Sequence, residues 1–187
     1  MRVIAGSAKR IQLKTLKGSM TRPTTDRIKE TLFNMIDPWI ADCEFLDLFA
    51  GSGGIGIEAL SRGAKSAVFI EKSRGAAEVI AKNLKAASLA EHAELIQADI
   101  YSGLGRLSGR KFDYIFMDPP YQGGFENRTL KLIGEFGLLK DDGMIIVEAA
   151  LETDFDYLSS LGYSLVKEKR YKTNKHVFIE MESEEPR

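Results

Sequence analysis

Two short segments carry residues whose types and spacing could do chemistry. The first is an apolar run, Phe112 to Met117, that leads directly into Asp118-Pro119-Pro120-Tyr121. A carboxylate and a backbone carbonyl can accept hydrogen bonds from a planar amine, and a phenol ring can stack on a base. Two consecutive prolines stiffen the loop, because each fixes φ and restricts its predecessor. The segment predicts a methyl-accepting site for an exocyclic base amine, with Asp118, Pro119 and Tyr121 as catalytic residues.

Such an amine is a poor nucleophile, because its lone pair is delocalised into the base ring. We expect Asp118 and the Pro119 carbonyl to hold its hydrogens in one plane while Tyr121 stacks on the ring. Extruding a base costs a few kcal/mol, and stacking returns about 1–3 kcal/mol. Because positioning is expected to supply much of the acceleration, Asp118 need not be a strong general base.

The second segment is a glycine-rich turn after the apolar run Phe45 to Phe49. Gly51, Gly53 and Gly56 let the backbone turn tightly and approach a ligand closely. With Glu71 at the end of the next strand pattern, this spacing also matches the dinucleotide fingerprint. A nicotinamide-dependent enzyme is therefore an alternative.

Acidic residues at three strand ends favour S-adenosylmethionine as the cofactor. Asp47, in the first strand, would help to bind a cationic amino-acid ligand and would not help to bind a pyrophosphate. Glu71 can bind ribose hydroxyls, and Asp99 can accept from an adenine amine. Taken singly, each of these residues is also typical of a helix cap or a solvated strand end.

Apolar runs alternate with helical patterns and predict an α/β fold, a doubly wound and mostly parallel sheet. The last two strand patterns are separated only by Lys172-Thr173-Asn174, which favours an antiparallel edge hairpin. Asp37-Pro38 should end the first helix, which carries Trp39 and other apolar residues at helical spacing. We expect strands near 44–49, 66–71, 93–98, 112–117, 143–148, 163–170 and 175–181, and helices near 54–62, 74–87, 126–136 and 153–161.

The composition of this 187-residue chain fits one compact domain with a modest extension. Cys43 is the only cysteine, so an intramolecular disulfide and a Cys-based zinc site are excluded, and we expect a buried structural thiol. His92 and His176 are too few for a metal site or a triad, and we predict no metal. No apolar run reaches the roughly 18 residues of a membrane span. These features predict a cytoplasmic protein.

Positive charge is concentrated near the N-terminus, although the net charge is −1. Residues 1–29 hold one acidic residue, Asp26, and eight basic ones, Arg2, Lys9, Arg10, Lys14, Lys17, Arg22, Arg27 and Lys29. A basic arm on an acidic body suits contact with nucleic acid, and a solvated tail is the alternative. A second basic cluster is either a solvated face or the rim of an RNA groove: Lys167, Lys169, Arg170, Lys172 and Lys175.

The order of several motifs resembles the RsmD family of bacterial class I methyltransferases, which methylate N2 of guanine 966 in 16S ribosomal RNA. The likeness covers nearly the whole chain and implies the Rossmann-like fold, with residues 1–40 as the basic arm and helix and residues 41–187 as the methyltransferase domain. The motifs that carry it are Arg22-Pro23-Thr24-Thr25-Asp26-Arg27, Asp47-x-Phe49-Ala50-Gly51-Ser52-Gly53, Glu58-Ala59-Leu60-Ser61-Arg62-Gly63, Glu71 and Asp118-Pro119-Pro120-Tyr121.

The resemblance also implies roles for individual residues. Asp47, Gly51 and Gly53 would hold the methionine moiety, Glu71 the ribose and Asp99 the adenine. The rest of the expected cofactor-binding set is Phe49, Lys72, Ile100 and Asp118. The expected RNA-facing set is Arg10, Arg22, Thr24, Thr25, Arg27 and Lys172, with simple helix capping as the alternative for the two threonines.

The implied partner is 16S ribosomal RNA within a partly assembled small subunit, bound by a monomeric enzyme. Two other functions remain open at this point. The same residues serve amino-methyltransferases that act on adenine N6 in DNA or on a protein glutamine. A non-catalytic module that binds cofactor and RNA is the other alternative, and intact Asp118 and Tyr121 argue against it.

Overall fold

The computed structural model describes residues 1–16, 26–121 and 123–182. Seven strands form one sheet, in the order β3-β2-β1-β4-β5-β7-β6. Strands β1 to β5 run parallel, and β7 is antiparallel to both β5 and β6. The strands are β1 Glu44–Leu48, β2 Ser66–Glu71, β3 Ala93–Gln97, β4 Phe112–Met117, β5 Leu139–Ala150, β6 Tyr163–Arg170 and β7 Asn174–Met181. The mostly parallel sheet and its antiparallel edge hairpin are thus confirmed.

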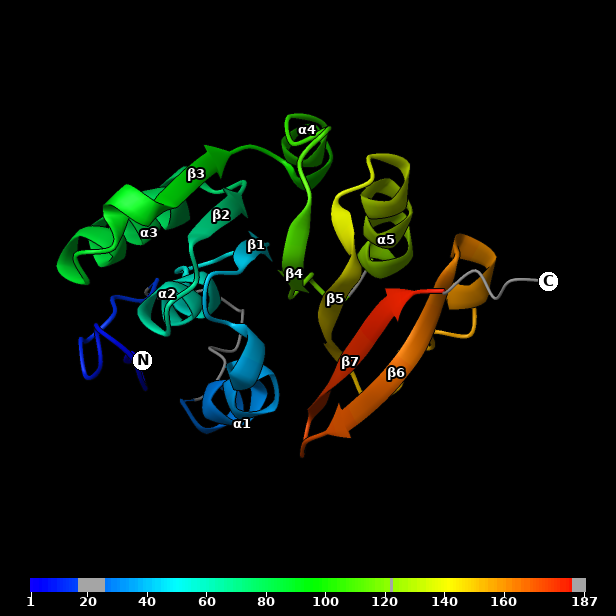
Figure 1. Cartoon of the computed structure of the whole chain (residues 1–187), viewed down its shortest axis with the longest axis horizontal. Coiled ribbons are helices and arrows are strands. Elements are labelled where there is room, and N and C mark those ends of the chain that lie inside the picture. The colour runs from blue at the N-terminus through cyan, green and yellow to red at the C-terminus, as the bar shows by residue number, and fades with distance from the viewer. Residues whose placement is uncertain (17–25, 122, 183–187) are drawn as a thin grey trace.

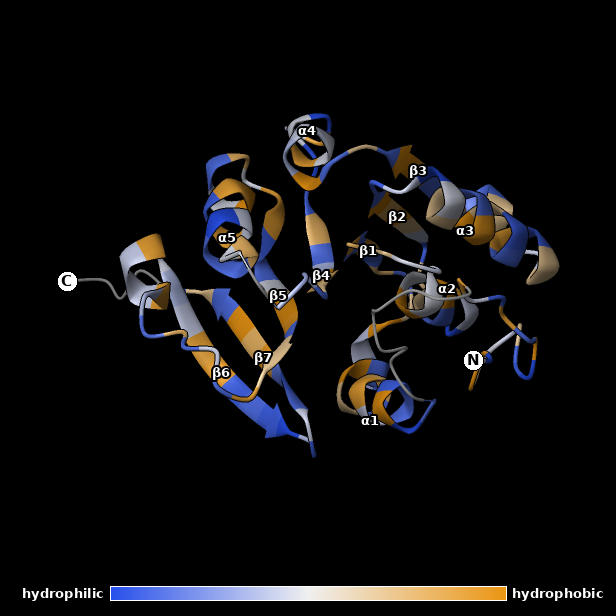
Figure 2. Cartoon of the chain, turned by 180° about the vertical axis from the view of Figure 1, so that it is seen from behind, coloured by the Kyte–Doolittle hydropathy of each residue, from blue (hydrophilic) through white to orange (hydrophobic). Residues whose placement is uncertain are grey.

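Helices cover both faces of this sheet, as Figure 1 shows. Buried side chains of the first three helices and of the N-terminal segment pack on one face, and those of α4 and α5 pack on the other. In Figure 2 the hydrophobic residues gather on the strands and on the helix sides that turn toward them. The helices are α1 Asp26–Ile36, α2 Gly54–Ser61, α3 Arg74–Ala86, α4 Ile100–Gly105 and α5 Phe125–Glu135.

The N-terminal segment packs on the protein core, and is not a solvated tail over residues 1–16. Val3, Ala8 and Leu13 are buried, and an isolated bridge pairs Arg2 with Gln12. The side chain of Glu58 on α2 accepts hydrogen bonds from the backbone N–H groups of residues 4 and 5, at 2.8 and 3.0 Å. This segment is therefore fixed to α2.

Lys29 corrects the prediction of a uniformly nucleic-acid-facing basic arm. Its side chain is fully buried, and Nζ lies 3.1 Å from Oε2 of Glu58. The ammonium also donates to the carbonyl of Arg2 at 2.6 Å. Burial lowers the pKa of Lys29, against the opposing effect of the nearby Glu58 carboxylate. Lys29 thus joins α1 to α2 and to the N-terminal segment.

Three predictions of secondary structure were wrong: one helix, one strand boundary and one missed helix. Residues 153–161 form no α-helix, only a 3-10 turn at Leu158–Leu161, because the Asp154 side chain accepts from the N–H of Asp156 and favours a turn instead. Strand β5 starts four residues before the predicted start, since the polar pair Asp141-Asp142 obscures its first part. Helix α4 was not predicted, because it is short and contains two glycines.

Two other predictions concern single side chains. Cys43 is 4% exposed, as predicted, and burial raises the pKa of its thiol to about 12. Trp39 is 66% exposed and does not belong to the core, because α1 ends at Ile36 and a 3-10 turn, Asp37–Trp39, carries the ring outward. In the described ranges, none of the helices combines the length and apolar character that a bilayer crossing requires.

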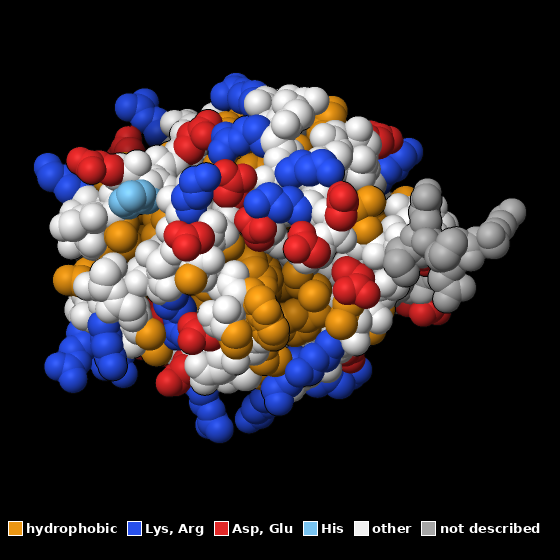
Figure 3. Space-filling view, in the orientation of Figure 1, with side chains coloured by type: hydrophobic (Ala, Val, Ile, Leu, Met, Phe, Trp, Pro, Cys, Tyr) orange, Lys and Arg blue, Asp and Glu red, His pale blue; other side chains and the backbone are white. Residues whose placement is uncertain are grey.

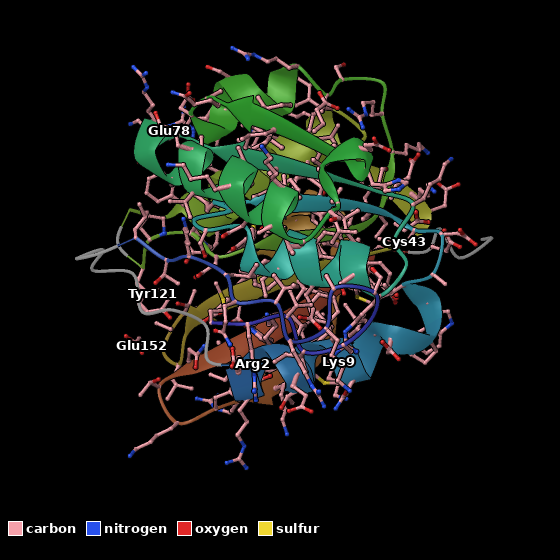
Figure 4. The ribbon with its side chains drawn as sticks, turned by 90° about the vertical axis from the view of Figure 1, so that its left-hand side faces the viewer. Arg2, Lys9, Cys43, Glu78, Tyr121 and Glu152 are labelled. Atoms are coloured by element: carbon pink, nitrogen blue, oxygen red, sulfur yellow. The ribbon has the colours of Figure 1, made fainter. Side chains whose placement is uncertain are left out.

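The buried ion pair at the base of α2 generates a stability prediction. Glu58→Gln should lower the free energy of unfolding by about 3–5 kcal/mol, because it leaves the Lys29 ammonium buried without a carboxylate. Equilibrium denaturation measures this change. Glu78→Gln is the matched control: this glutamate lies on α3 (Figure 4) and pairs with Arg74 at the surface, so its loss should cost less than about 0.5 kcal/mol. Equal effects of the two substitutions would contradict the prediction.

Candidate active site

The candidate site lies where the strand order reverses, between β1 and β4. Leu48, the last residue of β1, pairs with Met117, the last residue of β4. The glycine turn and the Asp118-Pro119-Pro120-Tyr121 loop therefore leave the sheet side by side, at the switch point where open α/β sheets bind ligands. Figure 4 places Tyr121 and Glu152, which follow β4 and β5, at one end of the sheet and Cys43, which precedes β1, at the other.

The turn after β1 has an unusual backbone. Phe49, Gly51 and Gly53 have φ values of 58°, 57° and 77°, in the left-handed region. Glycine adopts this region readily, whereas Phe49 is strained there, and strain of this kind is typical of ligand-binding loops. The turn delivers the chain to α2, whose first residue is Gly54.

Asp47 lies directly beneath this turn. Its side chain is buried, and Oδ2 accepts a 2.8 Å hydrogen bond from the N–H of Gly56 in the first turn of α2. Any Cβ at Gly56 would lie 2.3 Å from the Phe69 ring, so only glycine allows this approach. Burial raises the pKa of Asp47 to about 8, despite the Gly56 hydrogen bond. The site thus holds a carboxylate that lacks the solvation that usually stabilises its charge.

Glu71 ties the turn to the end of β2. One carboxylate oxygen accepts from the Gly51 N–H at 2.8 Å, and the other from the Ser73 N–H at 2.7 Å. Asn83, a buried residue of α3 that sequence reasoning missed, donates to the carbonyls of Ser52 and Lys14. The turn is therefore held from β2 and α3 before any ligand arrives.

Asp99 is the N-cap of α4. It accepts from the N–H groups of Tyr101 and Ser102 and, at 2.6 Å, from the Ser102 hydroxyl. This hydroxyl is the main cause of a lowered pKa for Asp99. The capping alternative is therefore present, and a role toward adenine stays a prediction. Ile100 begins α4 and is buried, whereas Lys72 is exposed just after β2.

The loop after β4 combines a partly buried carboxylate with a solvent-exposed aromatic ring. Asp118 is half-buried, Pro119 is buried, and Tyr121 is 53% exposed. Burial, followed by the Glu148 and Asp47 carboxylates, raises the pKa of Asp118 well above its usual value. A raised pKa favours the protonated form of this carboxyl group, which the sequence did not indicate.

Aromatic contacts join the loops around the site. Phe49, after β1, contacts Phe125 edge to face at 5.9 Å between ring centroids. Phe125 begins α5, the helix that follows the Tyr121 loop, so this contact links the two strand tips directly. On the neighbouring rim, the Arg128 guanidinium lies 3.9 Å from the centre of the Tyr101 ring. Neither pair was predicted, since each contact joins residues that are far apart in the sequence.

Sequence reasoning also missed Glu148, a buried residue of β5. The sequence did contain a pattern that indicates this residue, because Glu148 ends an apolar strand pattern just as Asp118 follows one. Its carboxylate contacts His176, which is fully buried, with 3.2 Å between Oε2 and Nε2. His176 is therefore a buried side chain in a polar setting. Across the described residues, no group of three or more His, Cys, Asp or Glu side chains could hold a metal ion.

The structure describes three of the predicted RNA-facing residues. Arg10, Arg27 and Lys172 are exposed on three separate segments. Arg22, Thr24 and Thr25 lie outside the described residues, so their predicted roles stay predictions. Figure 3 shows acidic and basic side chains interspersed on the face that it presents, which therefore carries no single sign of charge.

The second basic cluster is smaller than its sequence indicated. Lys175 is 5% exposed, and its ammonium lies 2.8 Å from Glu168, so it belongs to the interior of the hairpin. Arg170 also pairs with Glu168, at 2.7 Å. A cavity of about 370 Å³ lies beside this hairpin, and none of the predicted site residues lines it.

Comparison with known proteins identifies close relatives along nearly the whole chain. A family model described as Conserved hypothetical protein 95 matches residues 1–180. The Bacillus subtilis protein YlbH is 44% identical over 82% of this chain and 85% of its own. The Escherichia coli Ribosomal RNA small subunit methyltransferase D is 37% identical over 90% of this chain and 84% of its own. The solved structure of Escherichia coli yhhF has a TM-score of 0.85 and 34% identity, covering 98% of this chain and 99% of that one.

The raised pKa of Asp47 predicts a pH-dependent stability. Its ordinary pKa is 3.8 and its folded value is about 8, so the folded state binds this proton more tightly. The free energy of unfolding should therefore fall as pH rises from about 4 to about 8. Asp47→Asn removes this contribution. The variant should gain stability relative to wild type by at least about 1.4 kcal/mol, the value of one pKa unit, between about pH 5 and about pH 8.

Denaturation curves of both proteins at the two pH values measure this difference. Asp141→Asn is the control, because that side chain is 94% exposed and should leave the pH dependence unchanged. Parallel curves for wild type and Asp47→Asn would show that the buried carboxylate is not the cause.

Proposed function

The chain belongs to the Conserved hypothetical protein 95 family, and on this premise we propose that it transfers a methyl group from S-adenosylmethionine to the exocyclic N2 amine of a guanine in 16S ribosomal RNA. The name of the Escherichia coli relative supports the RNA as substrate. The choice of guanine N2 follows from the resemblance to the RsmD family.

One observation carries the proposal. The pairing of Leu48 with Met117 brings a glycine turn and a carboxylate-phenol loop to the same edge of the sheet. The Phe49–Phe125 contact joins the segments that follow them. A cofactor held by the first loop and a base held by the second would therefore meet, which is the requirement for direct transfer between them.

The residues of the glycine turn fit a cationic cofactor. Asp47 and Asp118 are carboxylates whose pKa values are raised mainly by burial, so a nearby positive charge would stabilise their ionised forms. S-adenosylmethionine supplies an amino-acid ammonium and a methyl group bonded to a sulfonium sulfur. Asp47, Phe49, Gly51 and Gly53 would hold its methionine part. Glu71, Lys72, Asp99 and Ile100 would hold its nucleoside.

A nicotinamide dinucleotide fits the same turn less well. Binding a pyrophosphate requires free backbone N–H groups and no negative charge close by. Here the Gly51 and Gly56 N–H groups already donate to Glu71 and Asp47. The two carboxylates would also repel a diphosphate. S-adenosylmethionine is therefore favoured over a nicotinamide dinucleotide as the cofactor.

The loop after β4 would prepare the amine for reaction. Asp118 and the carbonyl of Pro119 accept the two N2 hydrogens, and the exposed Tyr121 ring stacks on the guanine. The amine must also lose a proton on methylation. With its raised pKa, Asp118 can accept that proton as well as orient the amine, a role the sequence did not require of it.

We propose that the substrate is presented within a partly assembled small subunit and that the enzyme acts as a cytoplasmic monomer. The exposed side chains of Arg10, Arg27 and Lys172 would contact the RNA. The net charge of −1 supports help from other subunit components in holding it. Arg22, Thr24 and Thr25 complete the proposed RNA-facing set.

The first test identifies what is methylated. Wild-type protein with labelled cofactor should label small-subunit RNA at a guanine amine, and Asp118→Ala should lower the rate at least about 100-fold, the lower range for loss of general acid-base catalysis. Cofactor binding, measured separately by calorimetry, should weaken much less than the rate falls, because the glycine turn is unchanged in the variant. Label in DNA or protein, or no turnover at all, would refute the proposal, as would a variant with the wild-type rate.

A second prediction separates the Tyr121 ring from its hydroxyl. Tyr121→Ala should weaken RNA binding by about 1–3 kcal/mol, roughly 5- to 150-fold, through the lost base stacking. Tyr121→Phe retains the ring and should stay within about threefold of wild type, because a stacked base needs only the π-face. Binding of RNA to the two variants is measured by filter retention. Equal losses would point to the hydroxyl as the important group.

Salt dependence tests the basic residues. If Arg10 and Arg27 contact phosphate, neutralising both to Gln should reduce the slope of log affinity against log salt by about 2, one unit for each contact. Lys111→Gln is the control, because Lys111 precedes β4 and so lies at the opposite end of the strand from Tyr121. An unchanged slope in the double variant would make these charges solubilising only.

A further inference from the structure

A row of buried polar side chains continues sideways from the catalytic loop across the sheet. Met117 pairs with Val147, so Asp118 leaves β4 next to Glu148 on β5. Glu148 in turn pairs with His176 on the antiparallel strand β7. Glu148 is 4% exposed and His176 is fully buried. Three titratable residues thus occupy successive strands at one level of the sheet.

Hydrogen bonds fix the orientation of the two outer residues. Oε1 of Glu148 accepts from the Asn174 amide at 2.6 Å, and Oε2 lies 3.2 Å from Nε2 of His176. On the far side of the imidazole, Nδ1 lies 3.1 Å from the Tyr171 hydroxyl. Because a carboxylate only accepts, Nε2 must carry a hydrogen. The hydroxyl can donate to Nδ1 or accept from it, so His176 retains both hydrogen bonds whether neutral or cationic.

A purely structural role explains this arrangement poorly. Phe116 packs edge-on against the His176 ring, with centroids 6.0 Å apart, so the surroundings on that side suit an apolar residue. Glu148 is 4% exposed, and a carboxylate so deeply buried is costly unless a partner offsets its charge. His176 is positioned to do so. The buried Glu148 carboxylate lies next to Asp118, the residue whose charge governs the proposed chemistry.

We propose that Glu148 and His176 are positioning residues for methyl transfer: His176 offsets the negative charge of Glu148, so that Asp118 can carry the carboxylate that receives the guanine amine. This inference rests on the proposed function. It adds an explanation of how the charge of the Asp118 carboxylate, which accepts hydrogen bonds from the amine, is maintained. Glu148 acts on Asp118 from β5, and Asp47 acts on it from β1. His176 faces Glu148 on β5 and Tyr171 before β7, and it pairs in register with the exposed Lys169 on β6.

Two substitutions should move the pH profile of catalysis in opposite directions. Glu148→Gln removes a negative charge beside Asp118, so Asp118 ionises more easily and the acidic limb of kcat/KM should move to lower pH. His176→Gln keeps a donor for Glu148 but cannot become cationic, so the acidic limb should move to higher pH. We expect shifts of about one pH unit, which is a tenfold change in rate on that limb. KM for the cofactor should change little, since neither residue belongs to the glycine turn.

His92→Gln is the matched control, because His92 is the other histidine of the chain and is exposed. Its profile should coincide with that of wild type. Shifts of Glu148→Gln and His176→Gln in the same direction, or losses of activity without any shift, would overturn the inference, because a merely structural role predicts no opposite displacement.

Tyr171→Phe keeps the inference testable if either variant fails to fold. It removes only the hydroxyl, which can accept from a cationic imidazole, and should move the acidic limb in the same direction as His176→Gln by a smaller amount. An unmoved limb would overturn the inference. Wild-type protein that methylates no small-subunit guanine would overturn the proposed function itself, whereas normal wild-type turnover with unshifted variants would overturn the inference alone.

Discussion

Strand β1 pairs in parallel with β2 on one side and with β4 on the other, and the connections that leave these strands run to opposite faces of the sheet. In open α/β sheets, ligands bind at this point of reversal, where neighbouring connections diverge. The glycine turn and the Asp118 loop meet there because Leu48 and Met117 share a register position. A shift of one residue in this pairing would reverse the facing of Asp47 relative to Phe116.

Negative charge is concentrated at this end of the sheet. Asp47, Glu71, Asp118 and Glu148 end or nearly end four adjoining strands, and burial raises the pKa values of two of them. Backbone N–H groups and, at Glu148, the Asn174 amide and His176 compensate for the lost solvation. Burying these carboxylates is unfavourable for the folded chain, and a nearby positive charge would offset that cost.

Distant parts of the chain hold the glycine turn in place. Glu58, on the helix that begins at this turn, binds Lys29 of α1, Arg62 and the backbone of the N-terminal segment. Asn83 ties Lys14 to Ser52 within the turn. The N-terminal segment is consequently bonded to the same framework as the glycine turn. A substitution in the N-terminal segment is expected to alter the position of the glycine turn, because rigid hydrogen-bonded elements connect them.

Local patterns in the sequence were sufficient for the strand succession, the antiparallel hairpin, the glycine turn and the Asp118 loop, because each depends on residues that are neighbours in the chain. They were insufficient for Lys29, Lys175 and Trp39, whose burial or exposure depends on what packs against them. Helix α4 and the turn at 153–161 were misjudged where local side-chain hydrogen bonds to the backbone, and not periodicity, favour the observed structure. Only the tertiary structure determined the partners of Asp118, Glu148 and His176. Pairing between strands that are far apart in the sequence determines which charged side chains are buried together. No local sequence pattern indicates which strands will pair.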